Sequence, residues 1–383
     1  MTYFLRHFFL VATLSIIFSF VSKAQEIQSF GLENVGTKLS YIEDKKASFS
    51  LAEVQQMSDS AFKQGTQKIL NFGNTSSAWW VKIKYISPPH FQVHLVIDAP
   101  NIEYINAYIT DLGNKTVQFQ TGSLVKKSPN WTIGSNFTLK LPVTQVVEQK
   151  TIYLRLKSNN ILLAPVKLAS SENIISTPPI NEGIEYIYIG LLIGLLLFNL
   201  FVFVSIKDVT YLYYVLYVFT LSCYILLYLR GYSFIFGDNF RIFLNTYPHA
   251  LMGLSLLTLL VFSSKFLHLE TTAPWIKKMF YVIGCFGILL FFTSILGFKQ
   301  VASTITQLLS FISALIIWVA GIIAFRKGIK PAKYFIIAWS LILVSTIIVT
   351  FSLGGLIVQN EFSVQLVPVA TIIELLLLSF ALG

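Results

Sequence analysis

Cysteine is scarce in this chain, and charged residues make up only 12% of it. Only Cys223 and Cys285 occur among 383 residues, and both lie in long apolar runs. The polar N-terminal part therefore has neither a disulfide nor a cysteine-based metal site, and it must rely on a hydrophobic core of its own. The sequence also lacks a glycine-rich phosphate-binding loop, which is the usual sign of a nucleotide-dependent enzyme.

The basic excess is not concentrated in one region. The formal net charge is +10, with 15 basic and 12 acidic groups in residues 25–182 and 11 basic and 6 acidic groups in residues 183–383. A nucleic-acid-binding protein would gather its basic groups on the soluble part. We therefore expect no nucleic-acid partner.

Apolar sequence, by contrast, is abundant. Hydrophobic residues make up 55% of the chain, and about 20 helical residues span a hydrocarbon layer about 30 Å thick. Residues 183–383 contain seven runs of this kind and therefore predict an all-α bundle of seven transmembrane helices in contact with membrane lipid. The runs cover residues 183–206, 210–229, 249–267, 279–298, 301–325, 334–358 and 362–383.

Residues 1–24 have the pattern of a secretory signal peptide. Arg6 precedes an apolar run over residues 8–21, and Ser22 and Ala24 supply the small residues that signal peptidase requires. A permanent N-terminal anchor is the alternative, although the run is short for a span. In both cases the residues that follow are expected to be exported.

Residues 25–176 predict an exported all-β sandwich of jelly-roll type. Apolar and polar residues alternate there as in half-buried antiparallel strands, and proline, glycine and asparagine turn signals separate the strands. The clearest alternation covers residues 81–85, 92–98 and 151–157.

Two shorter features complete this part of the chain. Ser50 and Glu53 have the spacing of a capping box, which predicts one or two turns of helix after Ser50. Residues 177–182 form a linker in which Pro178 and Pro179 either stiffen the connection to the first span or simply end the last strand.

The loop charges predict the orientation of the bundle. An exported N-terminal domain followed by seven spans places the C-terminus inside, and inside loops are enriched in lysine and arginine. Eight basic residues fall in the predicted inside loops: Lys207, Lys265, Lys277, Lys278, Arg326, Lys327, Lys330 and Lys333. Three fall in the outside loops: Arg230, Arg241 and Lys299.

No catalytic set is recognisable, and we expect neither enzyme activity nor a cofactor. His90 and His94 are four residues apart, but no carboxylate lies near them at ligand spacing, so no metal site is predicted. Aromatic residues of the exported domain could stack on a sugar or another flat ligand. We take Trp131, Asn130, Trp80 and Tyr104 as the ligand-binding candidates, with Trp131 in an exposed loop and Trp80 more in keeping with a core position.

Two polar residues lie inside predicted spans. Asn199 is in the first span and Glu374 in the seventh, at similar depth. Ionisable groups in a membrane usually face the bundle interior, and no basic residue lies at that depth, so Glu374 is expected to be neutral. The two residues form either a structural hydrogen bond or a functional relay, and we predict that they face each other.

The order of signal peptide, exported sandwich and seven spans resembles the bacterial seven-transmembrane receptors with diverse intracellular signalling modules. The exported part is similar to their type 2 extracellular domain. The matching stretches are residues 41–44 (YIED), 71–75 (NFGNT), 80–82 (WVK), 101–113 (NIEYINAYITDLG), 121–122 (TG), 151–157 with Pro165, 190–194 (GLLIG), 198–200 (FNL), 211–214 (YLYY), 231–232 (GY), 338–339 (AW) and 374–382 (ELLLLSFAL).

This resemblance implies a carbohydrate-binding-like jelly roll that senses a ligand outside and a cytoplasmic output module, often a histidine kinase or diguanylate cyclase, after the seventh span. The given sequence stops at Gly383 without such a module. We therefore expect the output module either in a longer chain or in a partner protein. The sequence leaves open whether the protein is a monomer or a homodimer.

We interpret the sequence as a sensory receptor of the bacterial inner membrane, with a periplasmic N-terminal domain and a cytoplasmic C-terminus. It binds a small molecule or carbohydrate outside. The alternative is a glycan-related transport or envelope-assembly subunit of the membrane. A transporter would be expected to show broken helices in two related halves, which the sequence does not display.

Overall fold

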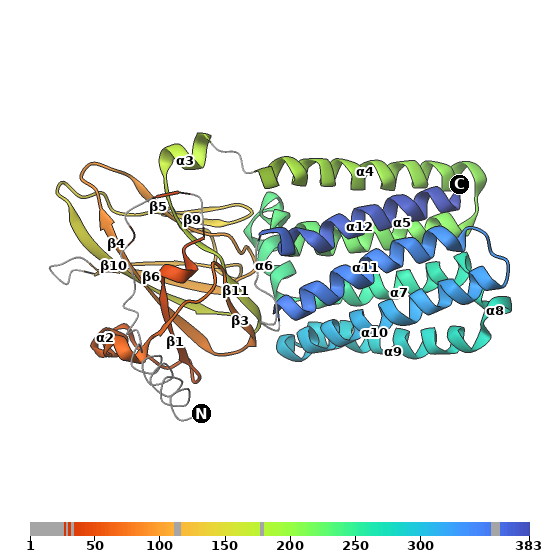
Figure 1. Ribbon diagram of the computed structural model, residues 1–383, viewed down its shortest axis with the longest axis horizontal. Coiled ribbons are helices and arrows are strands. Elements are labelled where there is room, and N and C mark those ends of the chain that lie inside the picture. The colour runs from red at the N-terminus through yellow and green to blue at the C-terminus, as the bar shows by residue number, and fades with distance from the viewer. Residues whose placement is uncertain (1–26, 28–29, 32–33, 111–115, 177–179, 354–360) are drawn as a thin grey trace, which may run out of the picture.

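The computed structural model describes residues 27, 30–31, 34–110, 116–176, 180–353 and 361–383. The predicted signal peptide and the two prolines of the predicted linker lie outside these residues. The chain forms a β-sandwich and a helical bundle that are stacked end to end (Figure 1). The C-terminus lies at the end of the bundle farthest from the sandwich (Figure 1).

The sandwich confirms the predicted all-β fold. One layer is a six-stranded antiparallel sheet in the order β2-β1-β4-β10-β6-β7, and the other contains the sheets β12-β5-β9-β8 and β11-β3. The strands of the first sheet are β2 (Lys63–Gln64), β1 (Ser40–Asp44), β4 (Ala78–Ser87), β10 (Glu148–Lys157), β6 (Tyr104–Thr110) and β7 (Thr116–Thr121). The others are β12 (Val166–Ser170), β5 (Val93–Ile97), β9 (Phe137–Lys140), β8 (Trp131–Ile133), β11 (Asn160–Ala164) and β3 (Leu70–Thr75).

The hydrophobic core lies between the two layers, as the alternating pattern predicts. Ile152, Leu154 and Leu156 of β10 are fully buried, whereas Arg155 and Lys157 face outward and are only half buried. Strand β5 differs from the prediction because all five of its residues are buried. Both of its faces are therefore covered.

Short helices border the sandwich: η1 (Gly36–Lys38), α2 (Leu51–Gln56), η2 (Asp59–Ala61) and α3 (Ser171–Ser176). The predicted capping box is confirmed in α2. The Ser50 hydroxyl accepts a hydrogen bond from the backbone N–H of Glu53, and the Glu53 carboxylate accepts one from the backbone N–H of Ser50. Val54 of α2 belongs to a small second core on the outer face of the six-stranded sheet, with Phe62, Trp80 and Tyr153.

Among the residues that the structure describes, the bundle has six helices that are long and apolar enough to cross a membrane and a shorter apolar stretch, residues 366–382, within its last helix. The six are α4 (Ile180–Ile206), α5 (Val209–Ser222) continued by the π-helical η3 (Cys223–Leu229), α7 (Pro248–Phe266), α9 (Pro274–Ile295), α10 (Lys299–Arg326) and α11 (Ala332–Leu353), and the last helix is α12 (Glu361–Leu382). This arrangement roughly matches the predicted seven. Helix α12 packs against both α11 and α4, so the predicted neighbourhood of the first and last spans is confirmed.

Shorter helices connect the spans at both ends. Helices η4 (Tyr232–Phe236) and α6 (Asp238–Thr246) lie at the end that faces the sandwich, and α8 (Leu269–Thr272) lies at the other end (Figure 1). Helix α6 falls in what the sequence presented only as a loop. It begins at Asp238 after Gly237, whose positive φ of 86° suits glycine.

Candidate functional site

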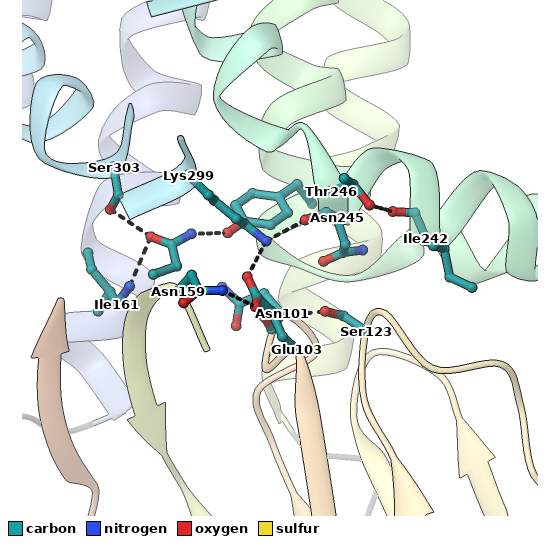
Figure 2. Close-up of polar contacts among 12 residues, drawn as sticks. Asn101, Glu103, Ser123, Asn159, Ile161, Ile242, Asn245, Thr246, Lys299 and Ser303 are labelled. Carbon is teal, nitrogen blue, oxygen red and sulfur yellow. Dashed lines mark hydrogen bonds and ion pairs between the residues drawn. The ribbon is translucent and has the colours of Figure 1, made fainter. Parts of the chain in front are cut away.

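A buried ion pair joins the sandwich to the bundle. Glu103 precedes β6, and Lys299 is the first residue of α10 (Figure 2). Their Oε1 and Nζ atoms are 2.6 Å apart, and the two residues are only 1% and 8% exposed. Lys299 also donates to the backbone carbonyl of Asn245 in α6, and the Asn159 amide donates to Glu103 at 3.3 Å. The pair is therefore surrounded by groups from both domains.

Asn160, the first residue of β11, contacts two transmembrane helices at once. Its side-chain amide donates to the Tyr228 hydroxyl of η3, and its side-chain oxygen accepts from the Ser303 hydroxyl of α10 at 2.6 Å. The same oxygen accepts from the backbone N–H of Ile161 at 2.9 Å (Figure 2). Both polar groups of this buried side chain are thus satisfied, which fixes the position of the β10–β11 turn against the bundle.

Arg241 of α6 reaches into the sandwich from the other side of the interface. Its guanidinium donates to the carbonyl oxygens of Gly122, Ser123 and Val125 at 2.6–2.9 Å. Gly122 has a φ of +143°, and a Cβ there would lie 2.1 Å from the Glu103 carbonyl oxygen, so only glycine fits. A planar guanidinium suits several fixed acceptors at once.

Asp238 completes this contact. Its carboxylate accepts from the Lys127 backbone N–H at 2.8 Å and from Arg241 at 2.9 Å. Burial alone would raise the pKa of this carboxyl, but the hydrogen bonds from Lys127 and Arg241 outweigh burial and hold the pKa below its usual value. Asp238 is therefore ionised at neutral pH and links the loop after β7 to α6.

The three contacts have a common origin in the sandwich. Strands β10, β6 and β7 are neighbours in the six-stranded sheet, and β6 runs antiparallel to the other two. Glu103 therefore precedes the start of β6 at the same edge where β7 ends before Gly122 and β10 ends before the turn to Asn160. The ends of three adjacent strands therefore supply these three contacts with the bundle. In the other layer, the Asn74 amide of β3 adds a hydrogen bond to the Thr304 hydroxyl of α10 at 3.0 Å.

The outward face of these strands carries polar and aromatic side chains. In the sheet register Arg155 lies opposite Asn106, which lies opposite Gln120, and Lys157 lies opposite Tyr104. These side chains are half buried or exposed. We call these five residues the outer face. Beside it, α2 and η2 lie against the outer side of β4 and β10, where Asp59 pairs with Lys82 at 2.8 Å.

The four predicted ligand residues are not brought together. Trp131 is only 1% exposed and packs in the main core, so the prediction of an exposed loop residue is wrong. The reason is that Trp131 begins β8 and lies opposite Leu139 of β9, on the side that faces the interior. Asn130 is exposed in the turn before β8, on a different part of the surface from the outer face.

Trp80 and Tyr104 do lie on one side of the same sheet. Trp80 is 1% exposed beneath α2 and stacks on Tyr108, with ring centroids 5.7 Å apart, so it belongs to the small second core. Tyr104 is 36% exposed and is the one predicted aromatic on the outer face that a ligand can reach.

Asn199 and Glu374 have different partners, and the prediction that they face each other is wrong. The Asn199 amide donates to the Ser379 hydroxyl of α12 at 2.8 Å, about one and a half turns further along than Glu374. Glu374 accepts from the Tyr217 hydroxyl of α5 at 3.1 and 3.2 Å. The first and last spans are therefore joined by Asn199 and Ser379.

Sequence reasoning missed the residues of the interface. The sequence identified Lys299 and Arg241 only as charged residues of outside loops, and Glu103 only as part of a stretch that matches the family. Asp238 directly after a glycine and before an apolar pattern would have indicated the start of α6. In the part of the chain that the structure describes, no group of three or more histidine, cysteine, aspartate or glutamate side chains could hold a metal ion.

Fold and interface together define a membrane protein whose β-sandwich is held by polar contacts against a bundle of transmembrane helices. The chain belongs to the family described as 7TM diverse intracellular signalling, which residues 181–383 match. Residues 36–170 match the family described as 7TMR-DISM extracellular 2. The predicted resemblance is thus confirmed, and the families are receptor-type sensory domains. No curated protein matches the chain.

Proposed function

We propose that this protein is the sensor and membrane part of a bacterial receptor. It binds a small polar ligand, such as a carbohydrate, on the outer face of the sandwich and transmits the event to a cytoplasmic output module through the bundle. The observation that carries the proposal is that the outer face and the contact with the bundle belong to the same strands. The same three strands that present the outer face also end in the residues that contact the bundle.

The outer face has the chemistry that a sugar or another flat polar molecule needs. Tyr104 offers an exposed ring for stacking. Arg155, Asn106 and Gln120 offer hydrogen-bond donors and acceptors in one row across β10, β6 and β7. Arg155 also donates to the Ala47 carbonyl at 3.0 Å, which orients its guanidinium at the border of the face.

Transmission requires only short distances. Tyr104 directly follows Glu103, and Lys157 is three residues from Asn160. A ligand that pulls β6 and β10 together or apart would therefore act on the Glu103–Lys299 pair and on the contact of Asn160 with Tyr228 and Ser303. Because packed interfaces have discrete arrangements, a small shift there can be converted into a movement of α10 and η3.

The same arrangement supports the proposed orientation and the proposed place of the output. The C-terminus of α12 and the sandwich lie at opposite ends of the bundle (Figure 1). With the sandwich in the periplasm, α12 ends at the cytoplasmic side, where a kinase or cyclase module or a separate partner would receive the signal. The same side carries the predicted inside loops with their eight basic residues.

The test uses the full chain in lipid nanodiscs and a panel of neutral oligosaccharides and small polar metabolites. Binding is followed by calorimetry, and hydrogen exchange reports on the backbone. We expect a ligand whose affinity falls in Tyr104→Ala and Arg155→Ala and is unchanged in Val146→Ala. Val146 is a suitable control because it is 66% exposed in the loop before β10, at the other end of that strand.

Two results would contradict the proposal at different points. If the Tyr104→Ala and Arg155→Ala variants bind the ligand with the same affinity as the wild type, the outer face is not the binding site. A ligand that binds there but leaves the amide exchange of residues 101–103 and 122–125 unchanged would show that the interface does not respond to it.

A further inference from the structure

The two ends of the bundle differ in how their basic residues are paired. At the end that faces the sandwich, the three basic residues between spans each have a carboxylate partner: Arg230 pairs with Glu185, Arg241 with Asp238 and Lys299 with Glu103. At the opposite end lie the eight basic residues of the predicted inside loops. Among the described residues, only Lys265 and Lys277 of these eight pair with a carboxylate, that of Glu270. Most of the positive charge at this end is therefore not neutralised.

Four of the eight belong to the turn that connects α10 with α11, at the end of the bundle farthest from the sandwich (Figure 1). They are Arg326, Lys327, Lys330 and Lys333, and all four are exposed. The turn has four basic residues and no acidic one, which gives it a formal charge of +4. In the part of the chain that the structure describes, none of the four pairs with a carboxylate.

The backbone of this turn is fixed by its own contacts. The N–H of Gly328 donates to the Phe325 carbonyl at 3.0 Å, and the N–H of Ile329 donates to the Ala324 carbonyl at 3.1 Å. These two bonds form the Schellman pattern, which ends a helix in a defined turn. The half-buried Ile329 side chain packs against the core of the bundle. The four charges are therefore gathered on one corner before any partner binds, which lowers the cost of binding.

The turn lies close to the hydrocarbon layer of the membrane. Phe325 directly precedes Arg326 and is 48% exposed, and Ile337, four residues after Lys333, is 52% exposed. Exposed apolar side chains of membrane-spanning helices contact lipid, and four helical residues rise about 6 Å. The long stems of lysine and arginine place their charges at the headgroups from such positions. A lipid phosphate is thus within reach of the turn, whereas an acidic protein would have to approach through the headgroups.

We propose that the turn between α10 and α11 binds the phosphate headgroup of an anionic phospholipid. A guanidinium such as that of Arg326 contacts a phosphate through two parallel hydrogen bonds, and the lysines add point charges. Basic clusters beside a span attract anionic lipids in this way. The Lys333 ammonium lies 4.7 Å from the centroid of the Tyr334 ring, which packs on Phe380 of α12. The bound headgroup therefore lies beside the last helix of the bundle. This site depends neither on the ligand of the sandwich nor on the proposed orientation.

Tryptophan quenching by brominated phospholipids tests this site in the full chain, reconstituted in phosphatidylcholine vesicles. Phe325→Trp adds a reporter beside the turn. Phe298→Trp is the matched control at the sandwich end, since Phe298 is 60% exposed and the adjacent Lys299 is buried in its ion pair. The quenching of each reporter is the difference from the chain without it. We expect brominated phosphatidylglycerol to bind severalfold more tightly than brominated phosphatidylcholine beside Phe325→Trp, and no such preference beside Phe298→Trp.

Substitution of the lysines tests whether the turn causes this preference. Lys327→Gln, Lys330→Gln and Lys333→Gln together should remove most of it, and high ionic strength should reduce it because salt screens exposed charges. These side chains are exposed, so the bundle keeps its core. The matched control removes the same charge from three exposed positions of the sandwich, through Lys45→Gln, Lys46→Gln and Lys63→Gln, and should leave the preference unchanged.

Three results would overturn the proposal. Equal quenching by the two lipids beside Phe325→Trp would leave an acidic protein surface as the better partner for the turn. A preference of the same size beside Phe298→Trp, or one that survives the three substitutions in the turn, would show a general attraction of the protein for anionic lipid. Displacement of phosphatidylglycerol by inorganic phosphate beyond that caused by sodium chloride at equal ionic strength would show that the turn takes a soluble phosphate instead.

Discussion

Replacing Lys299 should loosen the sandwich from the bundle. In Lys299→Met the apolar stem remains, but Glu103 keeps a carboxylate that is 1% exposed and has lost its cation. Removing one partner of a buried ion pair costs about 3–5 kcal/mol. At about 1.4 kcal/mol for each factor of ten, the docked state should lose between two and about three and a half orders of magnitude in its equilibrium constant.

Hydrogen exchange at the interface measures this loss. The backbone N–H groups of Ser123 and Leu124 donate to the carbonyls of Ile102 and Glu103, so their exchange reports on the strand edge that contacts the bundle. They should exchange faster in Lys299→Met, while the amides of β5 in the core should not change. The exchange rate of these amides can rise only until most molecules are undocked, because further loss of docking then changes nothing.

Two further variants decide whether the charge is the cause. Lys299→Met combined with Glu103→Gln removes the unpaired charge and should restore much of the protection at the edge. Lys46→Met removes an exposed lysine of the sandwich and should have no effect. If Lys299→Met exchanges like the wild type, the ion pair does not hold the domains together, and the reasoning is refuted.

Three other predictions concern single contacts. Because the pKa of Asp238 is lowered from 3.8 in the folded state, its contribution to docking should be complete above that value and be lost as pH falls through the folded pKa. In the wild type, the protection of the interface amides from hydrogen exchange should decrease as the pH falls through this range. In Asp238→Asn it should not show this dependence. Trp131→Ala should lower the free energy of unfolding of the sandwich by about 3–5 kcal/mol in a denaturant titration of the full chain, whereas Asn130→Ala should leave it unchanged. Cysteines introduced by Asn199→Cys and Ser379→Cys in a variant without native cysteines should crosslink, and failure to do so would contradict the contact between the first and last spans.

The general fold could be predicted because its signals are local and periodic. Strand β10 alternates between apolar and polar residues, and the structure buries Ile152, Leu154 and Leu156 as expected. The apolar runs were long enough to indicate membrane helices on length alone. The capping box at Ser50 was predicted correctly because its two residues are three positions apart and need no tertiary context.

Side-chain direction at isolated positions could not be predicted in this way. Trp131 follows a turn and begins a strand of only three residues, so no alternation shows which face it occupies. The rotation of α4 and α12 about their axes similarly decides whether Asn199 meets Glu374 or Ser379. Similar depth in two neighbouring helices was not sufficient, because residues five positions apart on a helix point in different directions.

The interface could not be predicted because its partners are far apart in the sequence. Glu103 and Lys299 each appear in an ordinary context: an acidic residue before a strand and a basic residue at the start of a span. Only the antiparallel order of β10, β6 and β7 brings Glu103, Gly122 and Asn160 to one edge, and only the packing of α10 and α6 brings Lys299 and Arg241 to meet them.

The chemistry of this edge suits the changing contact that the proposed function requires. A docking surface made of apolar side chains tolerates small shifts, because hydrophobic attraction has no preferred direction. Here Phe234 of η4 does pack on the sandwich core, but an ion pair, a guanidinium on main-chain carbonyls and an asparagine between two hydroxyls add directional contacts. Each has narrow limits of distance and angle, and a buried ion pair adds little net stability while it is costly to break. We infer that the interface is selective for one register of the sandwich on the bundle, so that a small displacement of the strand ends is enough to exchange one set of contacts for another.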